Sequence, residues 1–303
     1  MRTGLVVRID AKRCHVEVDD EVLLLSPRGR LFRDKGPSRN PIAVGDRVSV
    51  TLDGSGGGSI DRVLPRRTQL TRQSAGEGRQ EQVLVANVDR ALVVTSVKDP
   101  PFLPHLVDRI LAGAERGGID AHLVLNKIDL VPGIPGWRSF YEKLGYPVHL
   151  TSARTGAGIS GLTRVLEGHI TVFLGPSGAG KSALLNCIEP GLSLQVGEIS
   201  RRWREGKHTT THSSLLRLGA GGHVVDTPGL RNFGLFGLEP RDLATLFREF
   251  RPHLGSCTFK DCLHRQEPDC AVIAARSENR ISASRYASYL EVLADSEGGS
   301  LDR

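Results

Sequence analysis

The sequence has no hydrophobic run that approaches the roughly eighteen apolar residues of a membrane-spanning helix. Its first ten residues also lack the long apolar stretch that export requires. Only five of the 303 residues are cysteine, and this odd number without a secretory signal indicates reduced thiols rather than disulfides. No internal repeat is present. These absences predict a cytoplasmic protein with no membrane partner.

The composition favours several folded domains and an uneven surface charge. Hydrophobic residues make up 39% of the chain, enough for real cores, and the length suggests about two or three domains. The formal net charge is +6. Residues 1–72 hold fourteen Lys/Arg and nine Asp/Glu, residues 73–235 hold seventeen and fourteen, and residues 236–303 hold nine and eleven. A basic surface is therefore expected mostly in the N-terminal part.

Residues 175–182 match the phosphate-loop pattern G-x-x-x-x-G-K-[ST]. The apolar run 170–174 predicts a buried strand before the loop, and residues 182–188 predict a helix after it. Backbone N–H groups of such a loop surround phosphate oxygens, Lys181 adds a positive charge, and the Ser182 hydroxyl binds Mg²⁺. An ordinary glycine-rich turn is the alternative. The predicted phosphate-binding residues are Gly175, Pro176, Ser177, Gly178, Ala179, Gly180, Lys181, Ser182, Ala183 and Gly229.

Residues 126–129, Asn-Lys-Ile-Asp, follow another apolar run at the position where open α/β sheets bind ligands. The Asp129 carboxylate only accepts hydrogen bonds, so it pairs with the N1–H and N2 donors of guanine, which adenine lacks. After the extended stretch 146–150, residues 151–153 stand where a backbone N–H can reach the guanine carbonyl. The predicted guanine-binding residues are Asn126, Lys127, Ile128, Asp129, Ser152 and Ala153.

The Asp-Thr-Pro-Gly turn at 226–229 follows a third strand pattern. Asp226 is suited to binding Mg²⁺ through a water molecule. The Gly229 N–H would contact the γ-phosphate, so this loop should move when that phosphate leaves. A plain turn is the alternative. Segment 206–212 should add a threonine ligand, with Thr210 slightly preferred over Thr211. The predicted Mg²⁺ residues, for an ion bound together with GTP, are Ser182, Thr210 and Asp226.

Leu230 follows this turn, where many signalling GTPases carry a glutamine that orients the attacking water. Leucine cannot do that. His208 is the best polar candidate and is the predicted catalytic residue, although a solvated loop histidine is the alternative. We therefore expect slow unassisted hydrolysis and a regulated switch.

Four candidate metal ligands lie close together in the sequence, with the spacing C-x4-C-x-H-x5-C: Cys257, Cys262, His264 and Cys270. Three thiolates and an imidazole complete a tetrahedral Zn²⁺ site and leave no position for a catalytic water. The prediction is one structural zinc ion. Reduced cysteines packed in a small core are the alternative, and for Cys14 and Cys187 that interpretation is favoured.

The N-terminal part alternates short apolar strands with glycine-rich turns. Five or so strands in about 65 residues suggest a small barrel such as the OB-fold, whose loops commonly contact oligonucleotides. The predicted RNA-binding residues, all in the loop 26–41, are Arg28, Arg30, Arg33, Lys35 and Arg39. A solvated charged loop is the alternative. A second basic cluster in the predicted switch loop could also meet RNA, with disorder and surface charge as the alternative, and it comprises Arg201, Arg202, Arg204 and Lys207.

Beyond the cysteine cluster, apolar side chains recur at helical spacing, which indicates a helix packed on the metal module. They are Tyr286, Tyr289, Leu290 and Leu293. The acidic balance argues against this module as the main RNA contact, although Arg276, Arg280 and Arg285 could still touch RNA.

The base-reading motif precedes the phosphate loop, the reverse of the usual order. With Gly-Lys-His-Thr-Thr-Thr at 206–211 and the cysteine cluster, this order resembles the ribosome small-subunit-dependent GTPases, the circularly permuted family often called RsgA. The resemblance covers nearly the whole chain. It implies a protein that binds the 30S subunit late in maturation, hydrolyses GTP to GDP and phosphate there, and helps release assembly factors.

The predicted fold is an α/β P-loop GTPase domain, circularly permuted, with an N-terminal small β-barrel (OB-fold) and a C-terminal mainly helical zinc module. The predicted limits are 1–68 for the RNA-binding barrel, 69–235 for the GTPase domain and 236–303 for the zinc-binding domain. Expected partners are GTP, GDP, and the 30S subunit with its rRNA, bound by a monomer. A nucleotide-gated rRNA-binding assembly protein is one alternative, and a P-loop kinase or ATPase, disfavoured by Asp129, is another. Because the chain passes almost directly from the turn at Gly229 into the zinc module, we hypothesise that nucleotide state swings that module.

Overall fold

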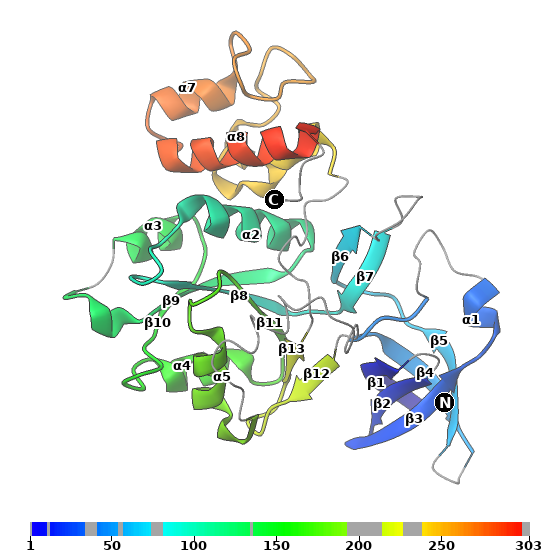
Figure 1. The fold of residues 1–303 in the computed structure, drawn as a ribbon. Coiled ribbons are helices and arrows are strands. Elements are labelled where there is room, and N and C mark those ends of the chain that lie inside the picture. Colours follow the sequence, from blue (N-terminus) through cyan, green and yellow to red (C-terminus); the bar gives the residue numbers. More distant parts are fainter. Residues whose placement is uncertain are drawn as a thin grey trace.

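The computed structural model describes residues 2–10, 13–33, 41–53, 57–73, 81–133, 136–192, 214–226 and 238–298. These residues form a small β-barrel, a sheet covered by helices on both faces, and a helical module (Figure 1). One sheet of eleven strands runs through the first two parts, in the order β10-β9-β8-β11-β13-β12-β1-β2-β3-β5-β4. None of the helices in the described ranges is long and apolar enough to cross a bilayer.

The N-terminal barrel consists of five strands and one short helix. Its elements are β1 Arg2–Asp10, β2 Arg13–Val18, β3 Glu21–Pro27, α1 Arg30–Arg33, β4 Arg47–Leu52 and β5 Gly58–Val63. Strand β1 pairs with both β2 and β4, while β5 pairs with β3 and β4, so the strands close on themselves. Alternate residues point inward, as Cys14, Val16 and Val18 do on β2. The predicted small barrel, and the core position of Cys14, are confirmed.

A two-stranded hairpin, β6 Gln69–Gln73 and β7 Glu81–Ala86, connects the barrel to the second part. Its Val85 bridges to Val44 of the barrel, and both side chains are buried. The barrel also joins the second part through an antiparallel pairing of Arg8 on β1 with Ser214 on β12. The two parts therefore share one continuous sheet.

The second part is a sheet with helices on both faces. Its strands are β8 Arg90–Ser96, β9 Asp120–Asn126, β10 Val148–Leu150, β11 Ile170–Leu174, β12 Ser214–Arg217 and β13 His223–Asp226. All pairings among them are parallel except that of β12 with β13. The central strands β8, β9 and β11 are nearly continuous apolar runs, because both of their faces are covered.

The helices of this part cover opposite faces of the sheet (Figure 1). They are α2 Pro104–Arg116, α3 Trp137–Lys143, α4 Ile159–Leu166 and α5 Lys181–Ile188, with the short 3-10 turns η1 Ile128–Leu130 and η2 Pro190–Leu192. Leu111 of α2 and Tyr141 of α3 belong to the core on one face. Leu162 of α4 and Leu184 of α5 belong to the core on the other face. The sheet is therefore fixed from both sides.

The C-terminal module is helical and rests on α2. Its elements are the 3-10 helices η4 Pro240–Leu246 and η5 Arg248–His253, followed by α7 Ala271–Ser277 and α8 Ala283–Gly298. Phe247, Phe250 and Tyr289 form the aromatic centre of its core, which also includes Ala112 of α2. Tyr289 and Leu293 are fully buried, while Tyr286 and Leu290 pack at the edge of this core. The predicted core face of α8 is confirmed.

Candidate functional site

The loop 175–180 joins the carboxyl end of β11 to the start of α5, the arrangement that the sequence predicts. Its glycines adopt backbone angles that other residues disfavour, with φ of 129° at Gly175 and 96° at Gly180. A Cβ at Gly175 would lie 1.9 Å from the Val94 carbonyl oxygen, and one at Gly180 would lie 2.3 Å from Asn126 Nδ2. Only glycine allows the loop to approach the neighbouring strands this closely.

Lys181 is buried at the first position of α5 and folds back over the loop. Its Nζ donates hydrogen bonds to the carbonyl oxygens of Gly175, at 2.8 Å, and Pro176, at 2.7 Å. Ser182 is buried beside it. The ammonium group is thus held above the loop, where phosphate oxygens would compete with the two carbonyls.

Asn126 connects the base-reading segment to the phosphate loop. Its Nδ2 donates to the Ala179 carbonyl oxygen at 2.9 Å, and its Oδ1 accepts from Thr151 Oγ1 at 3.2 Å. The Thr151 N–H in turn donates to the Leu125 carbonyl. One buried amide therefore fixes three loops relative to each other, at the carboxyl edge of the sheet.

Asp129 lies on η1 and both of its carboxylate oxygens are engaged. Oδ1 accepts from Ser152 Oγ at 2.5 Å, and Oδ2 accepts from Arg154 Nε at 2.8 Å. The hydrogen bond from Ser152 and, after it, the ion pair with Arg154 lower the pKa of Asp129 below its ordinary value despite partial burial. The carboxylate is therefore ionised at neutral pH, as an acceptor of two N–H donors must be.

The neighbouring residues of the predicted guanine site are placed by the backbone. Lys127 has φ of 61° and its Nζ donates to the Asp99 carbonyl oxygen. The Ile128 N–H donates to the Thr151 carbonyl at 3.2 Å. The Ala153 carbonyl accepts from the Cys187 thiol at 3.3 Å. The Cys187 side chain is exposed, so the prediction that it packs in a core is wrong. Its contact with Ala153 was not predicted from the sequence.

The predicted switch residues fall mostly outside the described ranges. His208, Thr210 and Gly229, together with the basic cluster at 201–207, are outside them. For Asp226 the structure describes the backbone only, which ends β13 opposite Ser214. Because β13 pairs in parallel with β11, its end lies at the same sheet edge as the phosphate loop.

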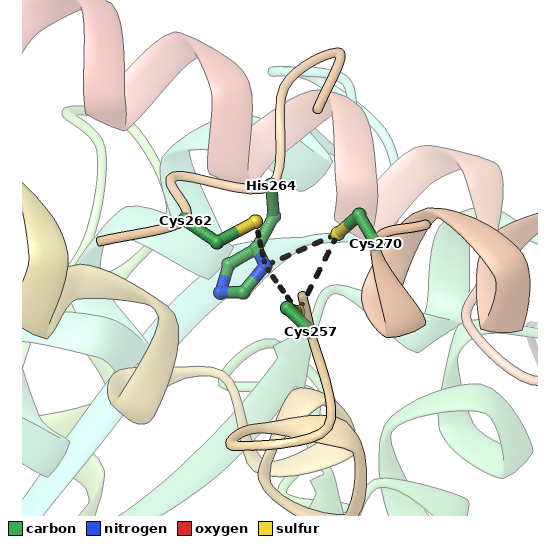
Figure 2. A group of neighbouring side chains, drawn as sticks. All are labelled: Cys257, Cys262, His264 and Cys270. Atoms are coloured by element: carbon green, nitrogen blue, oxygen red, sulfur yellow. Dashed lines mark hydrogen bonds between the residues drawn. The ribbon is translucent and has the colours of Figure 1, made fainter. Parts of the chain in front are cut away.

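The four predicted metal ligands converge in the C-terminal module (Figure 2). His264 Nδ1 lies 3.6 Å from Cys257 Sγ, 3.4 Å from Cys262 Sγ and 3.3 Å from Cys270 Sγ, and the sulfurs of Cys257 and Cys270 are 3.8 Å apart. A tetrahedral zinc site with bonds of about 2.3 Å to sulfur and about 2.0 Å to nitrogen requires ligand separations of about 3.8 and 3.6 Å. The residues therefore fit a tetrahedral metal ion.

The surroundings of this cluster support the same conclusion. Burial raises the pKa of the Cys262 and Cys270 thiols and lowers that of the His264 imidazole, so a nearby cation is what would favour the thiolates. The Glu267 carboxylate accepts the Leu263 and Arg265 N–H groups, each at 2.7 Å, and so holds the ligand loop in shape. These four side chains could hold one metal ion with no open coordination position.

The structure describes only some of the side chains that are predicted to bind RNA. Arg28 Nε lies 2.8 Å from Asp61 Oδ1, and Arg30 donates to the Asp61 carbonyl at 2.9 Å, so both fold onto β5 of the barrel. The Arg28 side chain keeps 48% of its surface exposed. The side chain of Arg33, and all of Lys35 and Arg39, lie outside the described ranges.

Arg285 does not belong to any RNA surface, and the prediction that it could touch RNA is wrong. Its side chain is 1% exposed, because the guanidinium pairs with Asp108 of α2 at 2.7 Å and with Glu249 at 2.6 Å. The same arginine lies over the Phe247 ring. It fastens the C-terminal module to α2. Arg276 and Arg280 are exposed.

Comparison with known proteins gives consistent matches along the chain. A family model described as RsgA GTPase matches residues 63–236. The small ribosomal subunit biogenesis GTPase RsgA of Bacteroides fragilis is 37% identical, over 98% of this chain and 97% of its own. Among solved structures, YjeQ from Thermotoga maritima has a TM-score of 0.79 and 37% identity, covering 98% of this chain and 99% of that one. YloQ, described as a circularly permuted GTPase, has a TM-score of 0.77 and 27% identity, covering 100% and 97%. The predicted circularly permuted fold is therefore confirmed.

Proposed function

This chain belongs to the RsgA GTPase family, and from that premise we propose that it hydrolyses GTP on the small (30S) ribosomal subunit during the late maturation of that subunit. It is a GTPase of the small-subunit type, as the sequence predicts. The observation that carries the proposal is the hydrogen bond from Asn126 to the Ala179 carbonyl, which joins the base-reading segment to the phosphate loop. Because the two segments are joined in this way, one nucleotide would contact both at once, with its base at the first segment and its phosphates at the second.

Base recognition falls to Asp129, whose ionised carboxylate offers two acceptors to the N1–H and N2 donors of guanine. At the other end, the backbone N–H groups of residues 175–183, except Pro176, which has none, and the Lys181 ammonium would hold the phosphates. Lys181 would exchange its two carbonyl partners for phosphate oxygens. Adenine offers no matching edge to Asp129, so GTP is the proposed substrate rather than ATP.

Hydrolysis requires a metal ion and a positioned water. Ser182, Thr210 and Asp226 are the proposed residues for Mg²⁺, which when bound with GTP would neutralise charge on the phosphates. The buried position of Ser182 at the start of α5 supports its part in this set. His208 remains the proposed residue for water positioning, and Gly229 the proposed γ-phosphate contact. Leu230 cannot orient water, which is why we propose that the subunit stimulates turnover.

The metal of the C-terminal module is proposed to be one structural Zn²⁺. Three sulfurs and one imidazole nitrogen, all within 4.8 Å of one another, are a donor set that zinc prefers. Cys257, Cys262, His264 and Cys270 would hold it, and Tyr286, whose hydroxyl donates to the His264 carbonyl at 2.7 Å, would steady the ligand loop. Metal analysis of the purified protein should give one zinc ion per chain, and none for Cys270→Ser. Zinc retained fully by that variant would contradict the assignment.

The three parts have separate proposed tasks. Residues 1–68 form the proposed rRNA-binding barrel, residues 69–235 the GTPase domain and residues 236–303 the zinc-binding module. For the barrel, the half-exposed Arg28 supports a contact with rRNA, whereas the engagement of Arg30 by Asp61 limits its reach. We also propose that the protein is a cytoplasmic monomer that binds GTP and GDP and has no membrane partner.

The test is GTP hydrolysis by the purified protein alone and with 30S subunits, 50S subunits or free rRNA, with ATP as a second substrate. We expect stimulation confined to 30S subunits and to GTP. Lys181→Ala should abolish turnover, and Asp129→Asn should remove the preference for GTP. Nucleotide-dependent 30S binding with normal maturation but without turnover would favour the rival, an rRNA-binding assembly protein in which hydrolysis is incidental.

A further inference from the structure

Arg154 is a charged side chain that contacts Asp129, the predicted base-reading residue, and that has no role in the proposed function. It stands at the tip of the turn 152–156, where the Ser152 hydroxyl and carbonyl accept the N–H groups of Thr155 and Gly156. The backbone of this turn is therefore fixed, whereas the Arg154 side chain is 72% exposed. Two of its nitrogens, Nε and one terminal nitrogen, each lie 2.8 Å from Asp129 Oδ2.

The contact differs from the usual arginine–carboxylate pair. Two parallel N–H donors of a guanidinium normally take one carboxylate oxygen each. Here both lie nearest to Oδ2, while the buried Ser152 hydroxyl donates to Oδ1 at 2.5 Å and leaves that oxygen one further acceptor direction. Nε donates a hydrogen bond to Oδ2 and the terminal nitrogen lies at ion-pair distance from it, so the guanidinium occupies the approach to this oxygen.

Guanine would approach the same atoms with the same chemistry. Its N1–H, C2 and N2 amino group form a guanidine-like unit that presents two parallel N–H donors, as Arg154 does. A base paired two-pronged with Asp129 needs one acceptor on each oxygen, and at Oδ2 its donor would meet the Arg154 guanidinium, which has two nitrogens 2.8 Å from that oxygen. The arginine and the base are therefore mutually exclusive partners of Asp129.

We infer that Arg154 is an intramolecular competitor of guanine, a side chain that imitates the edge of the base on Asp129 and must leave before GTP or GDP binds. The inference rests on the proposed guanine contact of Asp129. It makes Arg154 a determinant of nucleotide affinity that acts on GTP and GDP alike, because both share the base. Since most of the side chain is exposed, its release needs no backbone rearrangement.

The test is the dissociation constant of fluorescent GDP and of a fluorescent non-hydrolysable GTP analogue for the full chain, at low and high salt. Exposed ion pairs are weak, so Arg154→Ala should bind both nucleotides about two- to fivefold more tightly at low salt. The gain should be the same for both and should shrink at high salt, which screens the pair. Arg154→Lys should lie between the wild type and Arg154→Ala.

Arg164→Ala is the matched control, because Arg164 is an exposed arginine on the nearby helix α4 and its loss removes the same charge. It should leave both affinities unchanged. Weaker binding by Arg154→Ala, unchanged binding at low salt, or a gain for only one of the two nucleotides would overturn the inference. In an Asp129→Asn background the substitution of Arg154 should have no effect.

Asp129→Asn and Arg154→Ala separate the guanine contact of Asp129 from the competition by Arg154. If Asp129→Asn keeps the wild-type preference for GTP over ATP, the proposed guanine contact is wrong and the competition by Arg154 falls with it. If Asp129→Asn loses that preference while Arg154→Ala behaves like the wild type, the proposed function stands and only the competition is wrong.

Discussion

Asn126 has a wider part in the nucleotide site than its position in a base-reading motif implies. Its amide is buried, donates to the phosphate loop through Ala179 and accepts from Thr151. Each partner comes from a different loop, so this one side chain sets the distance between the proposed phosphate and base contacts. A single truncation should therefore weaken both ends of the site.

The first prediction concerns that amide. Asn126→Ala leaves the Ala179 carbonyl without this donor, a change of about 1–3 kcal/mol for a buried group, so GDP affinity should fall roughly tenfold. Thr151→Val removes only the hydrogen bond that orients the amide and should cost about twofold. Titration with fluorescent GDP measures both. Equal affinities for the wild type and Asn126→Ala would show that the loops hold their spacing without the amide.

The second prediction concerns two stacked histidines on β9 and β10. His149 Nε2 lies 2.9 Å from His122 Nδ1, and Asp120 lies 3.0 Å from the other nitrogen of His122. Burial, followed by the charges of His122 and Arg90, lowers the pKa of His149 to about 4 from its ordinary 6.5. Between pH 6.5 and 4, His149 binds a proton in the unfolded chain but not in the folded chain. The free energy of unfolding should therefore fall as the pH drops from 6.5 to 4, and His149 should cause no further loss below pH 4.

His149→Phe keeps a ring for stacking but cannot titrate. Because His149 is partly exposed, we expect a reduced effect: from pH 6.5 to 4 the free energy of unfolding of the wild type should fall by about 1–2 kcal/mol more than that of this variant. Urea unfolding at pH 7, 5.5 and 4 measures the difference. Parallel pH profiles for the two proteins would rule out His149 as the source.

Sequence patterns located the motif residues but not their partners. Glycine spacing and an acceptor-only carboxylate are local signals, and from them the sequence predicts that residues 126–129 and 175–182 form a site, which stays a prediction. The ion pair of Arg154 with Asp129 joins residues from two loops whose distance no local pattern encodes. Arg285 shows the same limit, because an arginine that the sequence presents as surface charge is buried on α8, where it pairs with Asp108 of α2.

At the scale of elements, helix α2 is the shared support of two parts of the molecule. One of its faces packs on the sheet, and the other contacts α8 of the C-terminal module. The hypothesised swing of the zinc module must therefore carry α2 with it or break the buried contacts of Arg285. The loop before α2 also accepts the Lys127 ammonium at the Asp99 carbonyl, which links this helix to the base-reading segment.

The third prediction tests this support. Arg285→Ala leaves Asp108 buried without its charge partner, and breaking a buried pair costs about 3–5 kcal/mol of unfolding free energy. Arg109→Ala removes a partly exposed pair of the same two helices, with Asp295 at 2.5 Å, and should cost about 0.2–1 kcal/mol. Urea unfolding compares the two. A small loss for Arg285→Ala would mean that apolar packing alone holds the module on α2.

The elements themselves followed closely from sequence. Apolar runs predicted β9 and β11, and helical spacing predicted the buried face of α8. The antiparallel pairing of β1 with β12 could not be predicted, because a short edge contact between distant strands leaves no periodic signal in either.

At the scale of the whole molecule, the barrel and the nucleotide domain are one structural unit. Arg217 of β12 reaches Glu17, at 3.0 Å, and Asp20, at 2.7 Å, across the junction of the shared sheet. Within the barrel, Arg66 holds the fully buried Asp46 with two nitrogens. A shift of the barrel on binding rRNA would therefore be transmitted to β12 and β13, the strands beside the phosphate loop.

The fourth prediction follows from these contacts. Scanning calorimetry should show the barrel and the nucleotide domain unfolding in one transition, because unfolding either part breaks the pairing of β1 with β12 and the ion pairs of Arg217. Arg66→Ala leaves Asp46 buried without its partner and so weakens the barrel alone, which should split this transition, with the barrel unfolding first. Arg2→Ala, at an exposed pair with Asp19 on the barrel alone, is the control and should change neither the number nor the order of transitions. Two transitions in the wild type would contradict the prediction.

The pairing of Arg8 with Ser214 also bears on how the chain is made. Strand β1 is synthesised before its partner β12, which follows both the base and the phosphate motifs in the chain. The barrel can close through β2 and β4, but the Arg8 end of β1 stays without its β12 partner until that later segment has emerged. Vectorial synthesis thus places the joining of the barrel to the nucleotide domain late in the folding of this permuted chain.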